Sequence, residues 1–268
     1  MDTRVVKLES DSRTVIVELV GPDDAPTVIC LPGMGDIRSV YRHISEPLVS
    51  RGYQVALVDL PGHGQSEVGS EPSQVAIAHV VSELIHTIGS PALVIAHSYT
   101  PDSALLASQL NRSIVGVLAI APWATTPRLN VWMRALSRWV ARTPWLWGLF
   151  YRSLHKMPPA DLNDHVRAIR RSLRRTHGTH TLQRMAVGIG KDATDLRART
   201  TVPVGIVMGG RDPDFENPRA EAEAFGEGLD ATITIAENSG HYPHTEEPGS
   251  VLEAFEALAI RTGFDAHA

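Results

Sequence analysis

The stretch PALVIAHSYT, residues 91–100, contains the change of pattern on which the fold prediction depends. Residues 91–96 are an apolar run of strand length, and residues 102–110 have the pattern of a helix, so a strand, a tight turn and a helix are predicted. Ser98 falls in that turn. A serine there is either an exposed nucleophile at the start of a helix or an ordinary capping residue, and the stretch by itself favours neither.

The same alternation of strand and helix patterns extends along the chain on both sides. Apolar and β-branched runs predict strands, and apolar residues at helical spacing predict helices. The expected strands are 13–20, 27–31, 53–60, 91–96, 115–121, 202–208 and 231–236, and the expected helices are 39–51, 73–88, 102–110 and 249–261. Because these strands are nearly continuous in apolar residues, both faces of the sheet should be covered, which predicts an α/β fold with a mostly parallel sheet.

Two further polar motifs come directly after predicted strands. They are VMGGRDPD (207–214) and NSGHYPH (238–244). Open parallel sheets place their sites at the carboxyl ends of strands, so Asp212 and His241 are candidates to join Ser98. Taken separately, Gly, Asp and Pro are also common turn formers, and a loop histidine is usually a surface residue. The order serine, aspartate, histidine along the chain favours a joint role.

Two glycine-containing loops add to these motifs. LPGMGD (31–36) looks like an oxyanion loop, and VDLPGHGQS (58–66) is similar to a D-x-x-G-x-G-x-S loop. Together with the three polar motifs, they make the chain resemble the α/β-hydrolase superfamily, in its capped serine esterase or lipase-like branch, over essentially its whole length. The resemblance implies a mostly parallel, predominantly eight-stranded sheet with helices on both faces, and an all-helical cap inserted after the sixth strand.

The resemblance also implies roles for individual residues. Ser98 corresponds to the nucleophile, His241 to the general base, and Asp212 to the carboxylate that orients the imidazole. The backbone N–H groups of Met34 and Tyr99 correspond to the oxyanion hole. The chemistry implied needs no metal ion and no cofactor.

The turn around Ser98 departs from the family pattern G-x-S-x-G. The residues two positions before and after the serine are Ala96 and Thr100. A β-branched threonine where glycine is usual predicts that the turn opens slightly or that the next helix packs at a different angle. Asp214 is the alternative to Asp212 as the acidic residue.

Residues 123–190 interrupt the alternation of strands and helices. They contain no strand-like run, and the segments 128–142 and 161–175 are amphipathic, with arginines on their polar faces. The expected division is therefore a hydrolase core made of residues 1–122 and 191–268, with residues 123–190 as a helical cap.

The predicted cap is basic although the chain is acidic. Residues 123–185 hold twelve basic and two acidic residues, a net charge of +10, whereas the whole chain has −5 and the rest therefore −15. Three interpretations are open. The arginines solvate the outer helix faces, they bind an anionic group of the substrate, or they bring an aromatic, basic cap into transient contact with an anionic lipid surface.

All five tryptophans lie between residues 123 and 147. A cap of this size has little core of its own, so several of its aromatic side chains are expected to face the substrate. The predicted lining of a large apolar acyl pocket is Trp123, Trp132, Trp139, Trp145, Trp147 and Phe150.

Composition excludes several other classes of protein. A net charge of −5 over 268 residues is the opposite of the basic excess of a general nucleic-acid binder. The single cysteine, Cys30, cannot form an internal disulfide or a thiolate metal cage, and the pair His177 and His180 has no third ligand nearby in sequence. Neither a signal-peptide pattern nor an apolar run of membrane-spanning length is present, so a cytoplasmic protein is expected.

The predicted function is a serine hydrolase that cleaves an apolar carboxylic ester, or a related acyl compound, through an acyl-enzyme. One alternative is a ligand receptor on the same fold with little or no turnover. Others are a carbon–carbon bond hydrolase, a thioesterase or a lyase that uses the same three residues. The expected partner is a small apolar acyl molecule, with or without an anionic group, and the sequence indicates no oligomeric state.

Overall fold

One mixed sheet organises the computed structural model, which describes residues 3–10, 13–68, 73–124, 131–175, 178–188, 197 and 199–264, with backbone only at 10, 13, 131–136 and 186–188. Within these residues the sheet has eight strands in the order β1-β2-β4-β3-β5-β6-β7-β8. They are β1 (Thr3–Ser10), β2 (Arg13–Val20), β3 (Thr27–Leu31), β4 (Gln54–Val58), β5 (Ala92–His97), β6 (Ile114–Ile120), β7 (Val204–Gly209) and β8 (Ala231–Ala236). β2 pairs antiparallel with β1 and β4, and all other neighbours are parallel.

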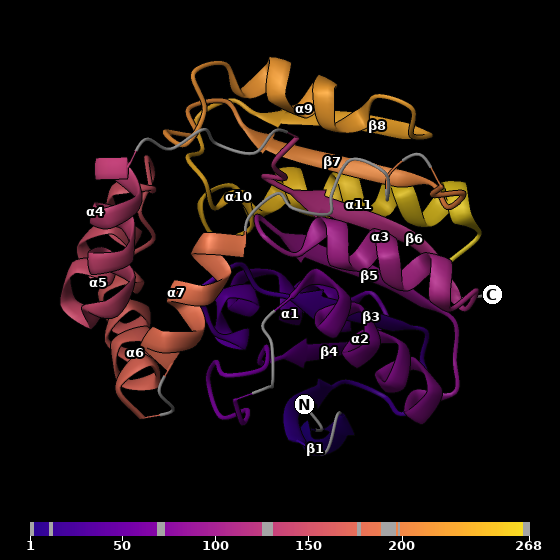
Figure 1. Ribbon diagram of the computed structural model, residues 1–268. Coiled ribbons are helices and arrows are strands. Elements are labelled where there is room, and N and C mark those ends of the chain that lie inside the picture. Colours follow the sequence, from indigo (N-terminus) through magenta and orange to yellow (C-terminus); the bar gives the residue numbers. More distant parts are fainter. Residues whose placement is uncertain are drawn as a thin grey trace.

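Helices cover both faces of this sheet, as Figure 1 shows. On one face α1 (Arg42–Ser50) packs beside α11 (Pro248–Thr262), and on the other α2 (Gln74–Ile88) packs beside α3 (Pro101–Leu110). The helix α9 (Pro218–Gly226) packs on β7 and β8, and two short helices, η1 (Arg38–Tyr41) and α10 (Pro243–Glu246), lie in loops. Every residue of β3, β4 and β5 is buried, as a strand covered on both faces requires. The predicted fold class is confirmed.

The strand β1 is absent from the strands that the sequence pattern predicts. It pairs with β2 alone, at the edge of the sheet, and all its described side chains except those of Val6 and Leu8 are exposed. An exposed edge strand needs no continuous apolar run, so its sequence carries little strand signal.

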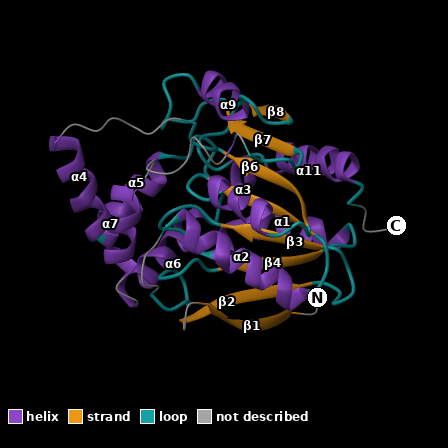
Figure 2. Ribbon diagram, turned by 45° about the vertical axis from the view of Figure 1, so that its right-hand side comes forward, coloured by secondary structure: helices purple, strands orange, loops and turns teal. Residues whose placement is uncertain are grey.

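Between β6 and β7 along the chain, which is the expected place of the helical insertion, the structure defines four helices within the described residues 131–175 and 178–188. They are α4 (Val131–Arg142), α5 (Pro144–Ser153), α6 (Leu162–Arg175) and α7 (Gly178–Gly188). Figure 2 shows them grouped at one end of the sheet, and α5 packs on α6 while α4 packs on α7. The predicted boundary at residue 190 lies outside the described residues. Among the described helices, none has the length and apolar character that crossing a membrane needs.

Candidate active site

Ser98 lies in the turn between β5 and α3. Its φ of +55° is in the left-handed region, which costs a residue other than glycine on the order of 1–2 kcal/mol. The Ser98 N–H donates to the carbonyl of Ile120 on β6 at 2.8 Å, and Pro101 occupies the first turn of α3, where no backbone N–H is needed. These contacts hold the tight turn, so the partly exposed Ser98 side chain stands at the carboxyl end of the sheet.

Thr100 stands where the family pattern has glycine, and its side chain is completely buried. Its Oγ1 accepts the N–H of His97 at 3.1 Å and donates to the carbonyl of Leu31 at 3.1 Å. Leu31 ends β3, so the threonine hydroxyl joins the turn to the neighbouring strand. Hydrogen bonds therefore accommodate the β-branched side chain in this turn.

A chain of hydrogen bonds connects Ser98 to the loops after β7 and β8. The Nε2 atom of His241 lies 2.9 Å from Ser98 Oγ, and Nδ1 of His241 lies 2.6 Å from Asp212 Oδ2. The side chains of Asp212 and His241 are almost wholly buried. Because a carboxylate only accepts hydrogen bonds, Nδ1 of His241 donates to Asp212, and Nε2 is left to accept the Ser98 hydroxyl proton.

Asp214 is a second carboxylate on the same side of His241. Its Oδ2 lies 3.7 Å from Nδ1 of His241, beyond hydrogen-bond range, and its N–H donates to Asp212 Oδ1 at 2.9 Å. Burial, which outweighs the charge of His241, raises the pKa of Asp214. Burial would lower the pKa of His241, but the charges of Asp212 and Asp214 outweigh it and raise this pKa to about 9.

The backbone of His241 is held from two directions. Its carbonyl accepts a hydrogen bond from Nε2 of His97 at 2.8 Å, and its N–H donates to the carbonyl of Leu154 at 2.9 Å. Leu154 directly follows α5, so the helical insertion contacts the histidine loop itself. The sequence places His97 beside Ser98 but assigns it no role, because a contact with a residue 144 positions away has no local signal.

The loop 33–36 lies against Ser98. A Cβ atom on Gly33 would lie 3.2 Å from Ser98 Cβ and 2.8 Å from His97 Nδ1, so this approach requires glycine. Met34 is the next residue of this loop, and Tyr99 directly follows Ser98. Their assignment to an oxyanion hole stays a prediction.

Gly35 is fixed by the core on one side and by the insertion on the other. Its N–H donates to Nε2 of His63 at 3.0 Å, and its carbonyl accepts a hydrogen bond from Nε1 of Trp147 at 3.2 Å. Burial lowers the pKa of His63, which keeps the ring neutral and able to accept. The φ of Gly35 is +74° and a Cβ atom on it would lie only 2.5 Å from the Trp147 ring, so residue 35 must be glycine.

Asp36 ties the same loop to two helices of the insertion. Its carboxylate lies 2.8 Å from the hydroxyl of Tyr151 on α5 and 2.8 Å from Nε2 of His165 on α6. Burial raises the pKa of Asp36, but the charge of His165 and the hydrogen bonds it receives outweigh burial and leave the pKa below its ordinary value. The insertion therefore holds the loop that faces Ser98.

Two of the predicted pocket aromatics lie near these loops. Trp123 packs edge-on against Phe215 with ring centroids 5.0 Å apart, and the Phe215 ring lies 6.3 Å from that of His241. Trp147 is buried against Gly35. Whether either side chain touches substrate stays a prediction.

Three other predicted pocket aromatics are exposed on the insertion. Trp139 and Trp145 are 58% and 51% exposed, and Phe150 is 37% exposed. The side chain of Trp132 lies outside the described residues. Exposure of this size favours a surface role for Trp139 and Trp145 in this conformation.

Among the described residues, one group of potential metal ligands comes close together, namely Asp212, Asp214 and His241, with ligand atoms within 4.8 Å of one another. The nitrogen of His241 that faces the two carboxylates already donates to Asp212. The hydrogen-bonded chain to Ser98 accounts for this arrangement.

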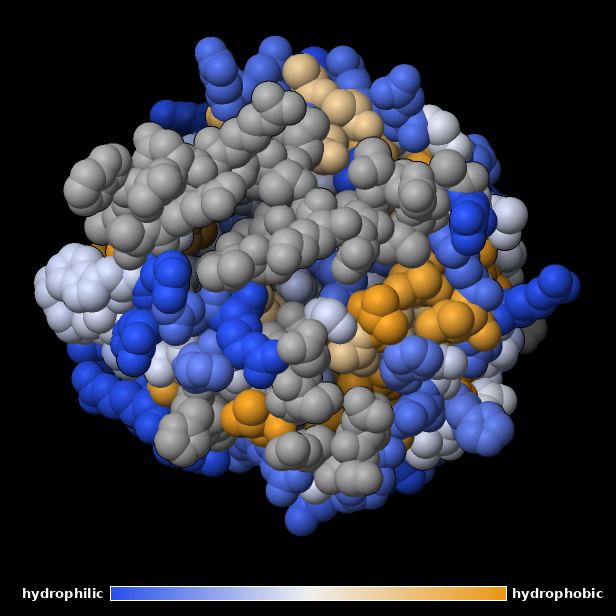
Figure 3. All heavy atoms as spheres, viewed as in Figure 1, coloured by the Kyte–Doolittle hydropathy of each residue, from blue (hydrophilic) through white to orange (hydrophobic). Residues whose placement is uncertain are grey.

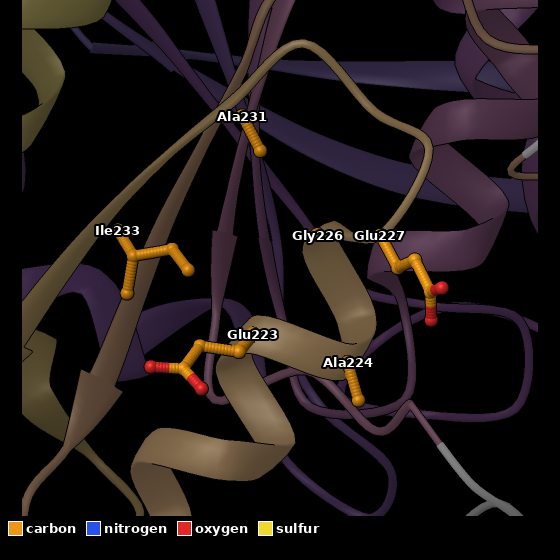
Figure 4. Close-up of a pocket in the computed structure, with 6 residues that line it drawn as sticks. All are labelled: Glu223, Ala224, Gly226, Glu227, Ala231 and Ile233. Atoms are coloured by element: carbon orange, nitrogen blue, oxygen red, sulfur yellow. The ribbon is translucent and has the colours of Figure 1, made fainter.

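A surface depression of about 410 Å³ lies elsewhere, between α9 and β8. Its lining is Glu223, Ala224, Gly226, Glu227, Ala231 and Ile233. The two glutamate carboxylates point away from each other (Figure 4). Since Ala231 begins β8 and His241 follows its far end, this depression is separate from the hydrogen-bonded chain.

The match to a protein family covers most of this architecture. The model of the "Alpha/beta hydrolase family" matches residues 28–254, which include Ser98, Asp212 and His241. The chain belongs to the alpha/beta hydrolase family. No curated protein matches the sequence.

Solved structures of other hydrolases share the fold of this family member. An esterase from Exiguobacterium antarcticum is 16% identical with a TM-score of 0.82, covering 95% of this chain and 99% of that one. A putative lipase from Acinetobacter baumannii is 18% identical with a TM-score of 0.83, covering 98% of this chain and 92% of that one. A thermophilic esterase from Thermogutta terrifontis is 18% identical with a TM-score of 0.78, covering 97% and 99%.

Proposed function

We propose that this alpha/beta hydrolase is a serine hydrolase that cleaves an apolar carboxylic ester, or a related acyl compound, through an acyl-enzyme. The observation that carries the proposal is the hydrogen-bonded chain from Ser98 Oγ through His241 to Asp212, with distances of 2.9 and 2.6 Å. A serine in a left-handed turn before a helix, joined to a histidine and a buried carboxylate, is the arrangement that activates a hydroxyl nucleophile.

In the proposed reaction, Ser98 Oγ attacks the acyl carbon while Nε2 of His241 takes the hydroxyl proton. The imidazolium then gives this proton to the leaving alcohol, and an ester bond to Ser98 remains. A water molecule, deprotonated by the same nitrogen, hydrolyses that bond and restores the serine. The N–H groups of Met34 and Tyr99 would stabilise the oxyanion, each donor contributing about 2.7–4 kcal/mol.

The proposal divides the chain into a core, residues 1–122 and 191–268, and a cap, residues 123–190, that bounds the substrate site. The hydrogen bonds from Trp147, Tyr151 and His165 to Gly35 and Asp36 support a cap that forms part of the site. No specific observation favours a receptor, a carbon–carbon bond hydrolase or a lyase.

A substrate screen tests the proposal. Purified protein is assayed with aryl esters of increasing chain length, acyl-CoA thioesters and lactones, and is treated with a fluorophosphonate probe. We expect turnover of an apolar ester and covalent labelling of Ser98. Saturable thermal stabilisation by ligands without turnover or labelling would indicate a receptor instead. A preference for thioesters would leave the proposed roles of Ser98, His241 and Asp212 unchanged but would change the proposed substrate class.

The pH dependence of kcat/KM follows from the environment of His241. His241 can accept a proton only when its imidazole is neutral. Burial would lower the pKa of His241, but the charges of Asp212 and Asp214 outweigh burial and raise this pKa to about 9. We therefore expect kcat/KM to rise with pH, with its half-maximal point well above 6.5. A pH–rate profile with the best ester measures this, and a midpoint at or below 6.5 would contradict it.

We also propose that the outer side of α4 and α5 makes transient contact with anionic lipid. Four large apolar side chains among those described on these two helices are exposed, namely Trp139, Trp145, Leu149 and Phe150. Arg138 and Arg142 are exposed on α4, and residues 131–153 contain no acidic residue. Figure 3 shows hydrophilic residues around paler ones on the side where α4–α6 lie. Exposed tryptophan beside basic residues fits a membrane interface with negative headgroups.

Vesicle binding tests the lipid contact. We expect the protein to co-sediment with vesicles that contain phosphatidylserine, and the Trp139→Ala, Trp145→Ala variant to bind about tenfold more weakly, since partial burial of aromatic side chains contributes on the order of 1–2 kcal/mol. Leu110→Ala, Ile260→Ala is the matched control, because both side chains are exposed on the core. Equal binding by both variants, or equal binding to neutral vesicles, would contradict the proposal.

A further inference from the structure

Glu246, the last residue of α10, has a buried carboxylate that accepts four backbone N–H groups. Oε2 lies 2.6 Å from the nitrogens of both Lys156 and Met157. The nitrogen of Gly240 lies 3.1 Å from both carboxylate oxygens, and that of Tyr242 lies 3.2 Å from Oε1. The carboxylate thus binds two segments that are far apart in sequence.

These two segments are the histidine loop and the connection between α5 and α6. Gly240 and Tyr242 are the neighbours of His241, and Lys156 and Met157 follow α5. The segments touch directly, because a Cβ on Gly240 would lie 2.2 Å from the carbonyl oxygen of Leu154. The N–H of His241 itself donates to that same carbonyl. Glu246 therefore strengthens, through its hydrogen bonds, the contact that fixes the position of His241 relative to the insertion.

The negative charge of Glu246 is compensated by peptide groups. Among the ion pairs between described residues, none includes Glu246, and the buried carboxylate faces four N–H dipoles instead. Removing the carboxylate would leave these buried donors without an acceptor, which is more costly than losing an exposed ion pair.

We propose that Glu246 is a positioning residue, whose carboxylate holds the His241 loop and residues 156–157 together so that the imidazole meets Ser98. The inference rests on the proposed serine hydrolase function for its kinetic consequence. Its structural part, the joining of two segments by one carboxylate, stands apart from that function and is measured separately.

The groups that face His241 come from several elements. Asp212 and Asp214 follow β7, His97 ends β5, and His155 follows α5. Glu246 and Tyr242 complete the surroundings. The charge of Glu246 adds to those of the two aspartates in raising the pKa of His241, whereas His97 is kept neutral by burial, which lowers its pKa to about 3. Loss of the Glu246 charge should therefore move the acid limb of kcat/KM to lower pH.

Glu246→Gln tests the inference, with Glu247→Gln as its matched control. Glu247 is the next residue and loses the same charge, but among the described residues its carboxylate accepts only the N–H of Asn238, at the start of the histidine loop, and does not bind residues 156–157. In Glu246→Gln one oxygen becomes an NH₂ group that faces N–H donors. We expect kcat to fall about tenfold to 100-fold, the effect of orphaned buried donors, with a smaller change in KM. We also expect faster amide exchange in residues 154–157 and 240–242.

Glu246→Asp is the second variant, and it provides a test that remains informative if Glu246→Gln does not fold. It keeps the charge but is one methylene shorter, so it cannot reach both segments. We expect faster amide exchange with an acid limb close to that of the native protein. Native exchange and native kcat in Glu246→Gln would overturn the inference. If Ser98→Ala retained turnover, the proposed function would fail, whereas the exchange data would still decide what Glu246 holds.

Discussion

Replacing Ser98 by alanine is expected to lower kcat for an ester substrate by roughly 10⁴- to 10⁶-fold, the range for loss of a serine nucleophile. The Ser98 hydroxyl lies 2.9 Å from Nε2 of His241, and alanine has no atom that could form the acyl bond. Initial rates with the best ester of the screen measure the loss. Mass spectrometry of the intact protein after fluorophosphonate treatment measures the labelling, which should disappear.

Ser153→Ala is the control for this substitution. Its hydroxyl is exposed on α5 and donates to the carbonyl of Phe150, away from the hydrogen-bonded chain. It should keep the native rate and the native labelling. Alanine at position 98 removes one oxygen from a partly exposed side chain, so the Tm should stay close to native. Turnover by Ser98→Ala near the native rate would contradict the assigned nucleophile.

Asp212→Asn should lower kcat by roughly 10⁴-fold, the effect of replacing an orienting carboxylate by an amide. Asp212 Oδ2 accepts the proton of His241 Nδ1 at 2.6 Å, and an asparagine NH₂ group in that place favours the opposite tautomer. The proton would then sit on Nε2, where the Ser98 hydroxyl needs an acceptor. Asparagine has the same shape as aspartate, so circular dichroism and thermal unfolding should indicate a native fold.

Asp214→Asn is the matched comparison for Asp212→Asn. Its carboxylate acts on His241 across 3.7 Å without a hydrogen bond, so removing its charge should cost less than about tenfold in kcat. The pKa of His241 should fall, because Asp214 is one of the charges that raise it, and the acid limb should move to lower pH. A larger loss in Asp214→Asn than in Asp212→Asn would reverse the assignment of the two aspartates.

The helical insertion is integrated into the site at its base and exposed at its outer side. Trp147 and Tyr151 hold residues 35 and 36, and the carbonyl of Leu154 holds His241. Trp139 and Trp145, in contrast, lie more than half exposed. Substitutions at the base should therefore act on catalysis, and those on the outer side on the choice of surface or partner.

Local sequence patterns predict some elements of this fold and miss others. Apolar strands such as β5 are predictable, because burial on both faces demands a continuous apolar run. The exposed edge strand β1 carries no such demand and is missed by the pattern. Thr100 departs from the family turn, and its hydrogen bonds to His97 and to the carbonyl of Leu31, 69 positions earlier, explain how it fits.

The surroundings of the aromatic side chains in the insertion also could not be predicted from local sequence patterns. Helical spacing in residues 128–142 indicates that Trp139 belongs to an apolar helix face, but neither this spacing nor the position of Trp147 indicates what the two side chains contact. Trp147 meets Gly35 and Trp139 meets solvent, according to how α4 and α5 pack. His63 and Glu246 act on backbone groups of distant segments, and such contacts leave no trace in local composition.

The sequence by itself determines the α/β architecture and the order of Ser98, Asp212 and His241, each after a different strand, because periodicity and turn chemistry are local properties. Tertiary structure alone decides that Asp212 rather than Asp214 bonds His241, and that Glu246 joins the histidine loop to the insertion. These outcomes depend on differences of about an ångström between segments far apart in the chain, and only the packing of the whole sheet and its helices sets such distances.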